Sequence, residues 1–182
     1  NIVHVQTRQA WRNWLSEFHR TADYCWVVPV ERQGDQYLDY VEEALCFGWI
    51  DSTVKKFDDT QTAQRFSPRK KKSNWTELNK ERVRRLDRLG LMAEAGYHVL
   101  PDMNPDSFVI DADILAQLQQ DEELYRHFQG LPDLYVRIKL DNIQSVRNDD
   151  TLYQNRLTKF IENTRANKMY GQWHDNGRLL AY

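Results

Sequence analysis

The sequence predicts an α+β protein, in which a small antiparallel sheet packed with helices is followed by a helical C-terminal half. Three β-rich runs, residues 24–30, 49–57 and 62–66, occur in the first half of the chain. Beyond residue 110, apolar residues recur only at helical spacing. A segment rich in Pro, Asp and Asn, residues 100–107, separates the two patterns and predicts a linker.

This pattern divides the chain into three parts. We expect an α+β core in residues 1–100, a helical region in 101–166 and a loosely packed tail in 167–182. A length of 182 residues corresponds to one domain, or two at most. No internal repeat accompanies the division.

The N-terminal elements each have local signals. Thr7 can cap a helix that runs to about His19, where tryptophans and other apolar residues recur at helical spacing. Pro29 indicates that the strand over residues 24–30 ends there or lies at an edge. The tripeptide Gln33-Gly34-Asp35 predicts a turn before a helix over residues 37–47, which Gly48 ends.

The next segment predicts a hairpin and then helices. The polar residues 58–61 connect the two strand candidates, and residues 67–74 form a loop. Ser73 or Asn74 then caps a helix from Trp75 to about Leu89. A shorter helix covers residues 91–97.

Four helices are expected in the C-terminal half, over residues 111–119, 121–129, 133–147 and 150–165. Their apolar stripe indicates a core. A helix-turn-helix over residues 133–165 is an alternative interpretation.

Composition excludes several classes of protein. A mean hydropathy of -0.78 and the lack of an apolar run near 18 residues exclude a membrane span. Two Cys exclude a disulfide-rich scaffold, and Cys25 and Cys46 lie in apolar runs typical of buried thiols, with a disulfide between them as the alternative. The five His are scattered, so neither a metal nor a cofactor is expected. Without a visible export signal, we expect a cytoplasmic protein.

The net charge of -2 hides an uneven distribution. In residues 54–90, twelve basic and five acidic side chains give +7, whereas residues 101–125 carry seven acidic and no basic side chains. The basic segment suggests an anion site. The alternative is that the two segments neutralise each other or are solvated.

The basic residues concentrate where a strand, a loop and a helix start meet. Arg65 and Arg69 precede the helix expected at Trp75, and the N-terminus of a helix attracts anions. A small anionic ligand is therefore the first partner hypothesis. The glycines of a P-loop are absent, so binding of a nucleoside triphosphate of that type is not supported. The second is nucleic acid, bound by Lys70, Lys71, Lys72, Arg82 and Arg85.

An enzyme is a third hypothesis. Glu42 and Asp51 could border one cleft, and paired carboxylates perform acid–base chemistry when their surroundings separate their pKa values. The alternative is that they pair with Lys55, Lys56 or Arg65. Whether the protein is an enzyme therefore stays open, with binding favoured over catalysis.

The stretch from Glu42 to Ser52, with Arg65 to Arg69 and Ser73 to Arg82, resembles the YdeI/OmpD-associated family of bacteriocin-protection proteins. The resemblance extends over residues 8–96 and continues at 108–115, at Leu131-Pro132 and in the tail at Asn167-Lys-Met-Tyr-Gly171. It implies a role in bacteriocin or antimicrobial-peptide resistance or stress, without assigning a mechanism. The candidate ligand-binding residues that it marks are Trp49, Asp51, Lys55, Arg65, Arg69, Ser73, Trp75, Asn79 and Arg82.

The leading hypothesis is therefore a non-enzymatic bacterial protein that binds an anion or another ligand. A protein partner is an alternative. The identity of the ligand and the oligomeric state are left open by the sequence.

Overall fold

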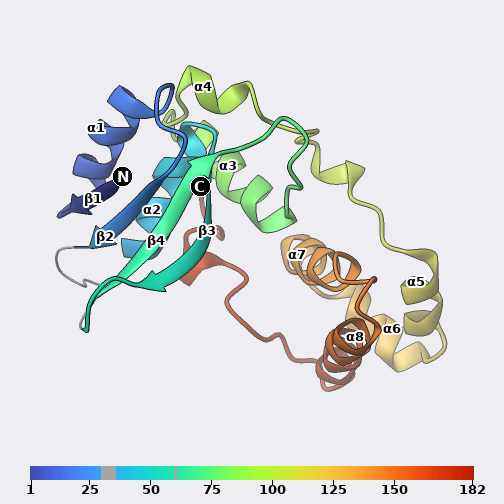
Figure 1. Cartoon of the computed structure of the whole chain (residues 1–182). Helices are drawn as coiled ribbons and strands as arrows, with labels where there is room; N and C mark the ends of the chain where they lie inside the picture. The colour runs from blue at the N-terminus through green and yellow to red at the C-terminus, as the bar shows by residue number, and fades with distance from the viewer. Residues whose placement is uncertain (30–35, 60) are drawn as a thin grey trace. The chain divides into compact units, whose positions relative to one another are not determined.

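The computed structural model describes residues 1–29, 36–59 and 61–182 (Figure 1). The turn expected at Gln33–Asp35 lies outside these residues, as does position 60 of the predicted hairpin connection. The chain forms two compact units. The N-terminal unit comprises residues 1–75, 81–101 and Tyr182, and the C-terminal unit comprises 76–80 and 102–181.

The described part of the N-terminal unit contains a four-stranded sheet in the order β1-β2-β4-β3. The strands are β1 (Ile2–Val5), β2 (Cys25–Pro29), β3 (Trp49–Lys56) and β4 (Thr62–Pro68). The α+β class is confirmed, but β1 pairs parallel with β2, so the sheet is mixed rather than antiparallel. Residues 2–5 are too short a run to stand out as a strand by pattern alone.

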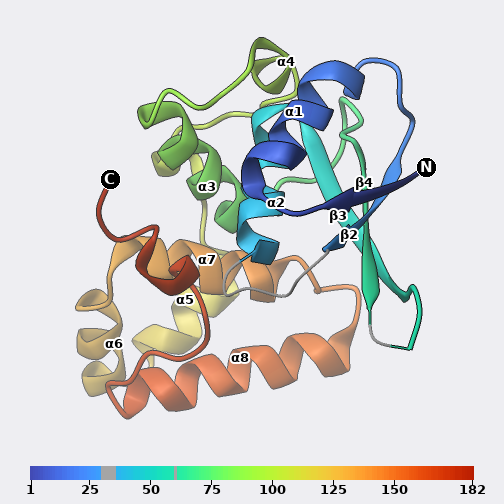
Figure 2. The same cartoon turned by 90° about the vertical axis from the view of Figure 1, so that its left-hand side faces the viewer.

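Two helices cover one face of this sheet (Figure 2). Helix α1 (Arg8–Phe18) begins as predicted, with the Thr7 side chain accepting a hydrogen bond from the Ala10 amide. Helix α2 (Gln36–Cys46) is followed by Gly48 in the left-handed region at φ +73°. Trp11 of α1 contacts Phe66 of β4 at a ring-centroid distance of 5.2 Å, and both are fully buried.

Helices follow the hairpin, and the N-terminal unit includes them from Glu81 to residue 101. Helix α3 (Glu77–Arg88) begins two residues later than predicted, and Gly90 follows it at φ +69°. Helix α4 (Glu94–Tyr97) is shorter than the predicted 91–97. Cys25 and Cys46 are both free and buried, as the apolar runs around them indicate.

The C-terminal unit is helical, as predicted. It contains η1 (Pro105–Ser107), α5 (Ala112–Gln119), α6 (Glu122–Gln129), α7 (Asp133–Gln144), α8 (Asp150–Arg165) and η2 (Asp175–Gly177). Its core includes Tyr135 of α7, Phe160 of α8 and Trp173 of the tail. Two apolar residues of the tail are buried: Trp173 and Leu179 are 8% and 3% exposed.

Three side chains of the acidic segment form ion pairs with arginines of their own unit. Arg147 bonds to both Asp111 and Asp113, at 2.5 and 2.6 Å, and Arg165 lies 3.5 Å from Asp121. Across the ranges that the structure describes, no helix is long and apolar enough to cross a membrane. No group of three or more His, Cys, Asp or Glu in those ranges is arranged to hold a metal ion.

Candidate ligand pocket

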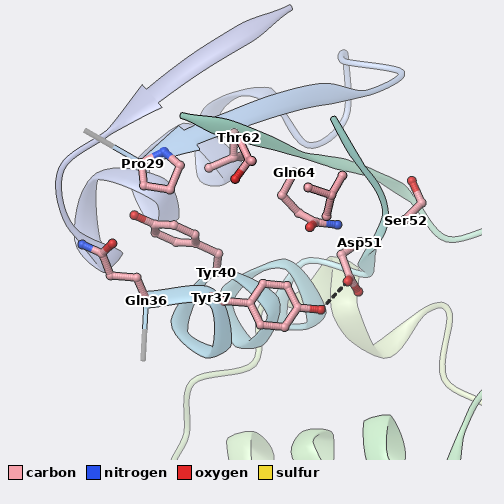
Figure 3. A pocket seen from close by; sticks show the side chains of 10 residues that line it. Pro29, Gln36, Tyr37, Tyr40, Asp51, Ser52, Thr62 and Gln64 are labelled. Atoms are coloured by element: carbon pink, nitrogen blue, oxygen red, sulfur yellow. Dashed lines mark hydrogen bonds between the residues drawn. The ribbon is translucent and has the colours of Figure 1, made fainter. Parts of the chain in front are cut away.

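A pocket of about 480 Å³ opens between α2 and the helix-covered face of the sheet (Figure 3). Its walls are mainly the aliphatic side chains of β2 and β3 and two tyrosine rings of α2. The lining residues are Val27, Pro29, Gln36, Tyr37, Tyr40, Asp51, Ser52, Val54, Thr62 and Gln64.

Local structure explains why these residues meet. Tyr37 and Tyr40 are three residues apart in α2 and therefore lie on one face of that helix. Gln64 of β4 is paired with Val27 of β2 on one side and with Val54 of β3 on the other, so the three side chains form one row across the sheet. The helix face and this row form the two sides of the pocket.

Polar groups lie among the apolar walls of the pocket (Figure 3). The Tyr37 hydroxyl donates to the Asp51 carboxylate at 2.6 Å. The Tyr40 hydroxyl is buried without a hydrogen-bond partner in the described residues, and burial raises the pKa of Tyr40. A buried polar atom without a partner costs free energy, so a ligand that bonds to Tyr40 would be stabilised there.

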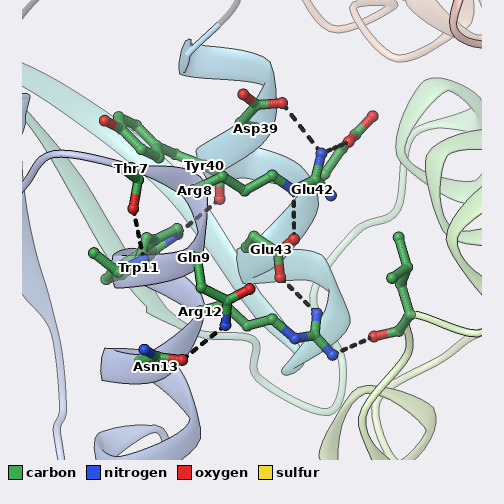
Figure 4. A network of polar contacts seen from close by, with 12 residues as sticks. Thr7, Arg8, Gln9, Trp11, Arg12, Asn13, Asp39, Tyr40, Glu42 and Glu43 are labelled. Atoms are coloured by element: carbon green, nitrogen blue, oxygen red, sulfur yellow. Dashed lines mark hydrogen bonds and ion pairs between the residues drawn. The ribbon is translucent and has the colours of Figure 1, made fainter.

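Only one of the two candidate carboxylates lines the pocket. Asp51 does, whereas Glu42 is completely buried in a charged network that connects α1 with α2 (Figure 4) and includes Arg85 of α3. Arg8 and Arg85 donate to Glu42 at 2.8 and 2.9 Å. The expected ion pairing is thus found for Glu42, but its partners are Arg8 and Arg85 rather than Lys55, Lys56 or Arg65.

The same network holds the neighbouring carboxylate. Glu43 accepts from Arg8 at 2.5 Å and from Arg12 at 2.6 Å, and Asp39 accepts from Arg8 at 3.1 Å. Burial opposes the charge of Arg8. Its hydrogen bonds with Glu43 and Glu42, together with the negative charges of these residues, nevertheless raise the pKa of Arg8. These contacts fasten α1 to α2, the helix that carries Tyr37 and Tyr40.

The basic loop differs from the expected helix-cap site. Helix α3 is capped by Thr76, whose hydroxyl accepts from the Asn79 amide at 3.2 Å, and not by Ser73 or Asn74. The Glu77 amide donates to the Asp141 carboxylate at 3.0 Å. The amides of Glu77 and Asn79 therefore already donate to oxygen atoms of the protein, whereas the sequence suggested that amides at this helix start would bind an anionic ligand.

Arg69 is 6% exposed and stacks on Trp75, with 3.6 Å between its guanidinium carbon and the ring centroid. Its Nη1 donates to the Asn74 carbonyl at 3.1 Å. Burial lowers the pKa of Arg69 to about 10, although the charge of Asp51 opposes this. Within the described ranges, no carboxylate lies within 4 Å of this guanidinium, and its Nε and the Ser73 hydroxyl are buried without partners.

Two other candidates lie on the uncovered face of the sheet. Lys55 stacks on Trp26 at 4.1 Å, and Arg65 stacks on Tyr24 at 4.7 Å. Trp49 instead belongs to the core, 1% exposed, with its indole N–H donating to the His19 carbonyl at 3.3 Å.

The remaining candidates are dispersed. Arg82 is 8% exposed and Arg85 is paired with Glu42, so only Lys70, Lys71 and Lys72 of the proposed nucleic-acid surface are exposed. Asn79 belongs to the C-terminal unit. Of the nine candidates, the structure places Asp51 in the pocket and Arg69 with Ser73 and Trp75 in the loop.

Comparisons with known families divide the chain much as the structure does. Residues 3–99, more than half of the chain, match the family described as a domain of unknown function, DUF8412. Residues 107–167 match the family described as Bacteriocin-protection, YdeI or OmpD-Associated. The chain belongs to the DUF8412 family.

The YdeI/OmpD-associated match confirms the resemblance found in the sequence, but it covers the helical C-terminal unit. The motif residues from Glu42 to Arg82, and with them the pocket, lie in the DUF8412 match. No curated protein and no solved structure matches the chain.

Pattern reasoning missed the tyrosines and the sheet row that form the pocket. The available signal was the spacing of Tyr37 and Tyr40 on a helix whose other face carries Glu42 and Glu43. That spacing was compatible with a core position as well as with a pocket wall.

Proposed function

We propose that the N-terminal unit binds a small organic molecule that has an apolar body and a hydrogen-bond-donating head. The observation that carries this proposal is the buried, unpartnered Tyr40 hydroxyl in a pocket of about 480 Å³ with apolar walls. A ligand in this pocket would bury its apolar body against Val27 and Val54 and supply the missing partner of Tyr40.

The pocket favours a neutral or cationic ligand. Asp51 is its acidic residue, and no Lys, Arg or His is among its described lining residues. An anionic head would meet the Asp51 carboxylate, whereas an ammonium or amide N–H would donate to it. The described lining also lacks a nucleophile–base pair, which favours binding over catalysis.

The biological role proposed here is protection against bacteriocins or related stress. It rests on the description of the family that the C-terminal unit matches. Deleting the gene should raise the sensitivity of its host to bacteriocins, and the wild-type gene should restore resistance. Restoration by a pocket variant that no longer binds ligand would separate this role from the pocket.

Two probes of the same shape and opposite charge test the pocket. Phenethylamine should bind and phenylacetate should not, as measured by amide shifts of pocket residues in 1H–15N spectra. Asp51→Asn should weaken phenethylamine about tenfold, the loss of one charge-assisted hydrogen bond. Asp59→Asn, at a carboxylate that is 99% exposed, is the matched control.

Tyr40→Phe adds a test that separates binding from folding. Because the hydroxyl has no partner, its removal should leave the free protein as stable or about 1 kcal/mol more stable. The same change should weaken any ligand that bonds to Tyr40. Equal binding of both probes, or unchanged binding by Asp51→Asn and Tyr40→Phe, would refute the proposal.

A second candidate function is anion binding at Arg69. The specific observation is a guanidinium that is 6% exposed and has no carboxylate within 4 Å among the described residues. A buried cation of this kind is stabilised by an anion. Phosphate should then shift the Nε–H resonance of Arg69, and an unchanged resonance at saturating phosphate would eliminate this site.

A further inference from the structure

We propose that the C-terminal unit carries an anion site, built by Lys139 of α7 and Lys159 of α8 beside Tyr170, that binds a phosphate group. The ammonium groups of both lysines lie close to one aromatic ring: Nζ of Lys139 is 4.0 Å and Nζ of Lys159 is 5.0 Å from the Tyr170 centroid. A negatively charged group between them would contact two cations at once.

The chain after α8 is shaped to bring Tyr170 to these lysines. Asn167 adopts a left-handed conformation at φ 51°, and the Lys168 amide donates to the Asn163 carbonyl at 2.9 Å, which ends the helix and reverses the chain. Gly171 follows at φ +77°, where an added Cβ would lie 2.7 Å from Nζ of Lys139. The tail motif from Asn167 to Gly171 therefore encloses Lys139 on one side.

The charge of this cluster is unbalanced. Neither ammonium group has an ion-pair or hydrogen-bond partner among the residues that the structure describes. Arg156, one turn before Lys159 on α8, adds a third cation near Tyr170 and donates to the Asn142 carbonyl at 2.6 Å. Partial burial and the charge of Lys159 lower the pKa of Lys139.

Aromatic rings attract ammonium groups by their negative faces, but a ring carries no net charge and leaves the repulsion between the lysines in place. A dianion removes that repulsion. Phosphate is the favoured dianion because its oxygens accept from several N–H donors at once, which suits two ammonium groups on different helices.

A cavity beside Lys139 indicates on which side of the lysines the anion would lie. It measures about 240 Å³ and is lined by Lys139, Asn142 and Gln172, but also by Asp141. The Asp141 carboxylate repels an anion, so the phosphate would lie at the solvent side of Lys139 and Lys159 and not inside this cavity.

The test is a titration of the full chain with inorganic phosphate, followed in 1H–15N spectra at constant ionic strength maintained with chloride. The Tyr170 and Gly171 amides should shift saturably. Lys139→Met and Lys159→Met should each raise the dissociation constant about tenfold or more, the size expected for one lost charge-assisted hydrogen bond. Lys168→Met, an exposed lysine of the same tail, is the matched control and should leave the affinity unchanged.

Further arms separate the sources of the phosphate group and the effect of folding. Phosphoserine that binds more tightly than inorganic phosphate would indicate a phosphate ester as the natural ligand, and the reverse order would indicate free phosphate. The same spectra show whether each variant is folded. In wild type, bound phosphate should raise the pKa of Lys139, because its negative charge stabilises the ammonium form. The proposal is overturned if chloride alone produces the same shifts, if Gly171 does not shift, or if both lysine variants bind as wild type does.

Discussion

Arg8→Met tests whether the charged network between α1 and α2 stabilises the N-terminal unit. Arg8 donates to three carboxylates, of which Glu42 and Glu43 have side chains only 1% and 3% exposed, whereas Asp39 is 27% exposed. The solvent-exposed pair with Asp39 contributes little. The two buried contacts dominate, and each hydrogen bond to a buried charged group is worth about 1.5–3 kcal/mol.

The sum of two such bonds is discounted for two reasons. The Arg8 side chain is itself 31% exposed, so water replaces part of its interaction. Each carboxylate also keeps a second cation, Arg85 for Glu42 and Arg12 for Glu43. We therefore expect Arg8→Met to lower the free energy of unfolding by about 2–4 kcal/mol.

Urea unfolding followed by circular dichroism measures this loss. Arg20→Met, at an exposed arginine beyond the end of α1, is the control and should change the stability by less than about 0.5 kcal/mol. A loss below about 1 kcal/mol for Arg8→Met, with an unchanged denaturant slope, would refute the reasoning, because it would mean that the remaining arginines suffice to neutralise both buried carboxylates.

Three further predictions follow from local structure. Thr7→Ala should cost about 1 kcal/mol in urea unfolding, because it removes the side-chain cap of α1; an unchanged midpoint would contradict the cap. Burial raises the pKa of Cys25 and Cys46 to about 12, so both remain thiols through neutral and moderately alkaline pH. A thiol reagent at pH 8 should therefore modify both only after unfolding. Rapid reaction of the folded protein would contradict their burial. Gly48→Ala should destabilise more than Gly90→Ala by thermal melting, because both have positive φ but only at Gly48 would a Cβ approach backbone and side-chain atoms to 3.0 Å; equal losses would contradict the role of crowding.

Elements with local signals were predictable from the sequence. Thr7 begins α1 as expected, and α8 occupies residues 150–165 because its spacing, length and N-terminal Asp149 agree. The start of α3 was misplaced because Ser73, Asn74 and Thr76 are all capping residues, and sequence alone does not choose among them.

Long-range relations were not predictable in the same way. The partners of Glu42 are 34 and 43 residues away in sequence, and no periodicity connects them. The pocket likewise depends on the register that pairs Gln64 with Val27 and Val54. Asp51 was identified for its charge, but its hydrogen bond with Tyr37 required the fold.

The placement of tryptophans has a spectroscopic consequence. Five of the six lie in the N-terminal unit, and Trp173, packed 5.4 Å from Tyr135 by ring centroids, is the one in the C-terminal unit. The difference in fluorescence between wild type and Trp173→Phe therefore isolates the emission of the C-terminal unit. This difference can be recorded during denaturation together with the total emission. Comparing the two curves shows whether the DUF8412 and YdeI/OmpD-associated parts unfold together or one after the other.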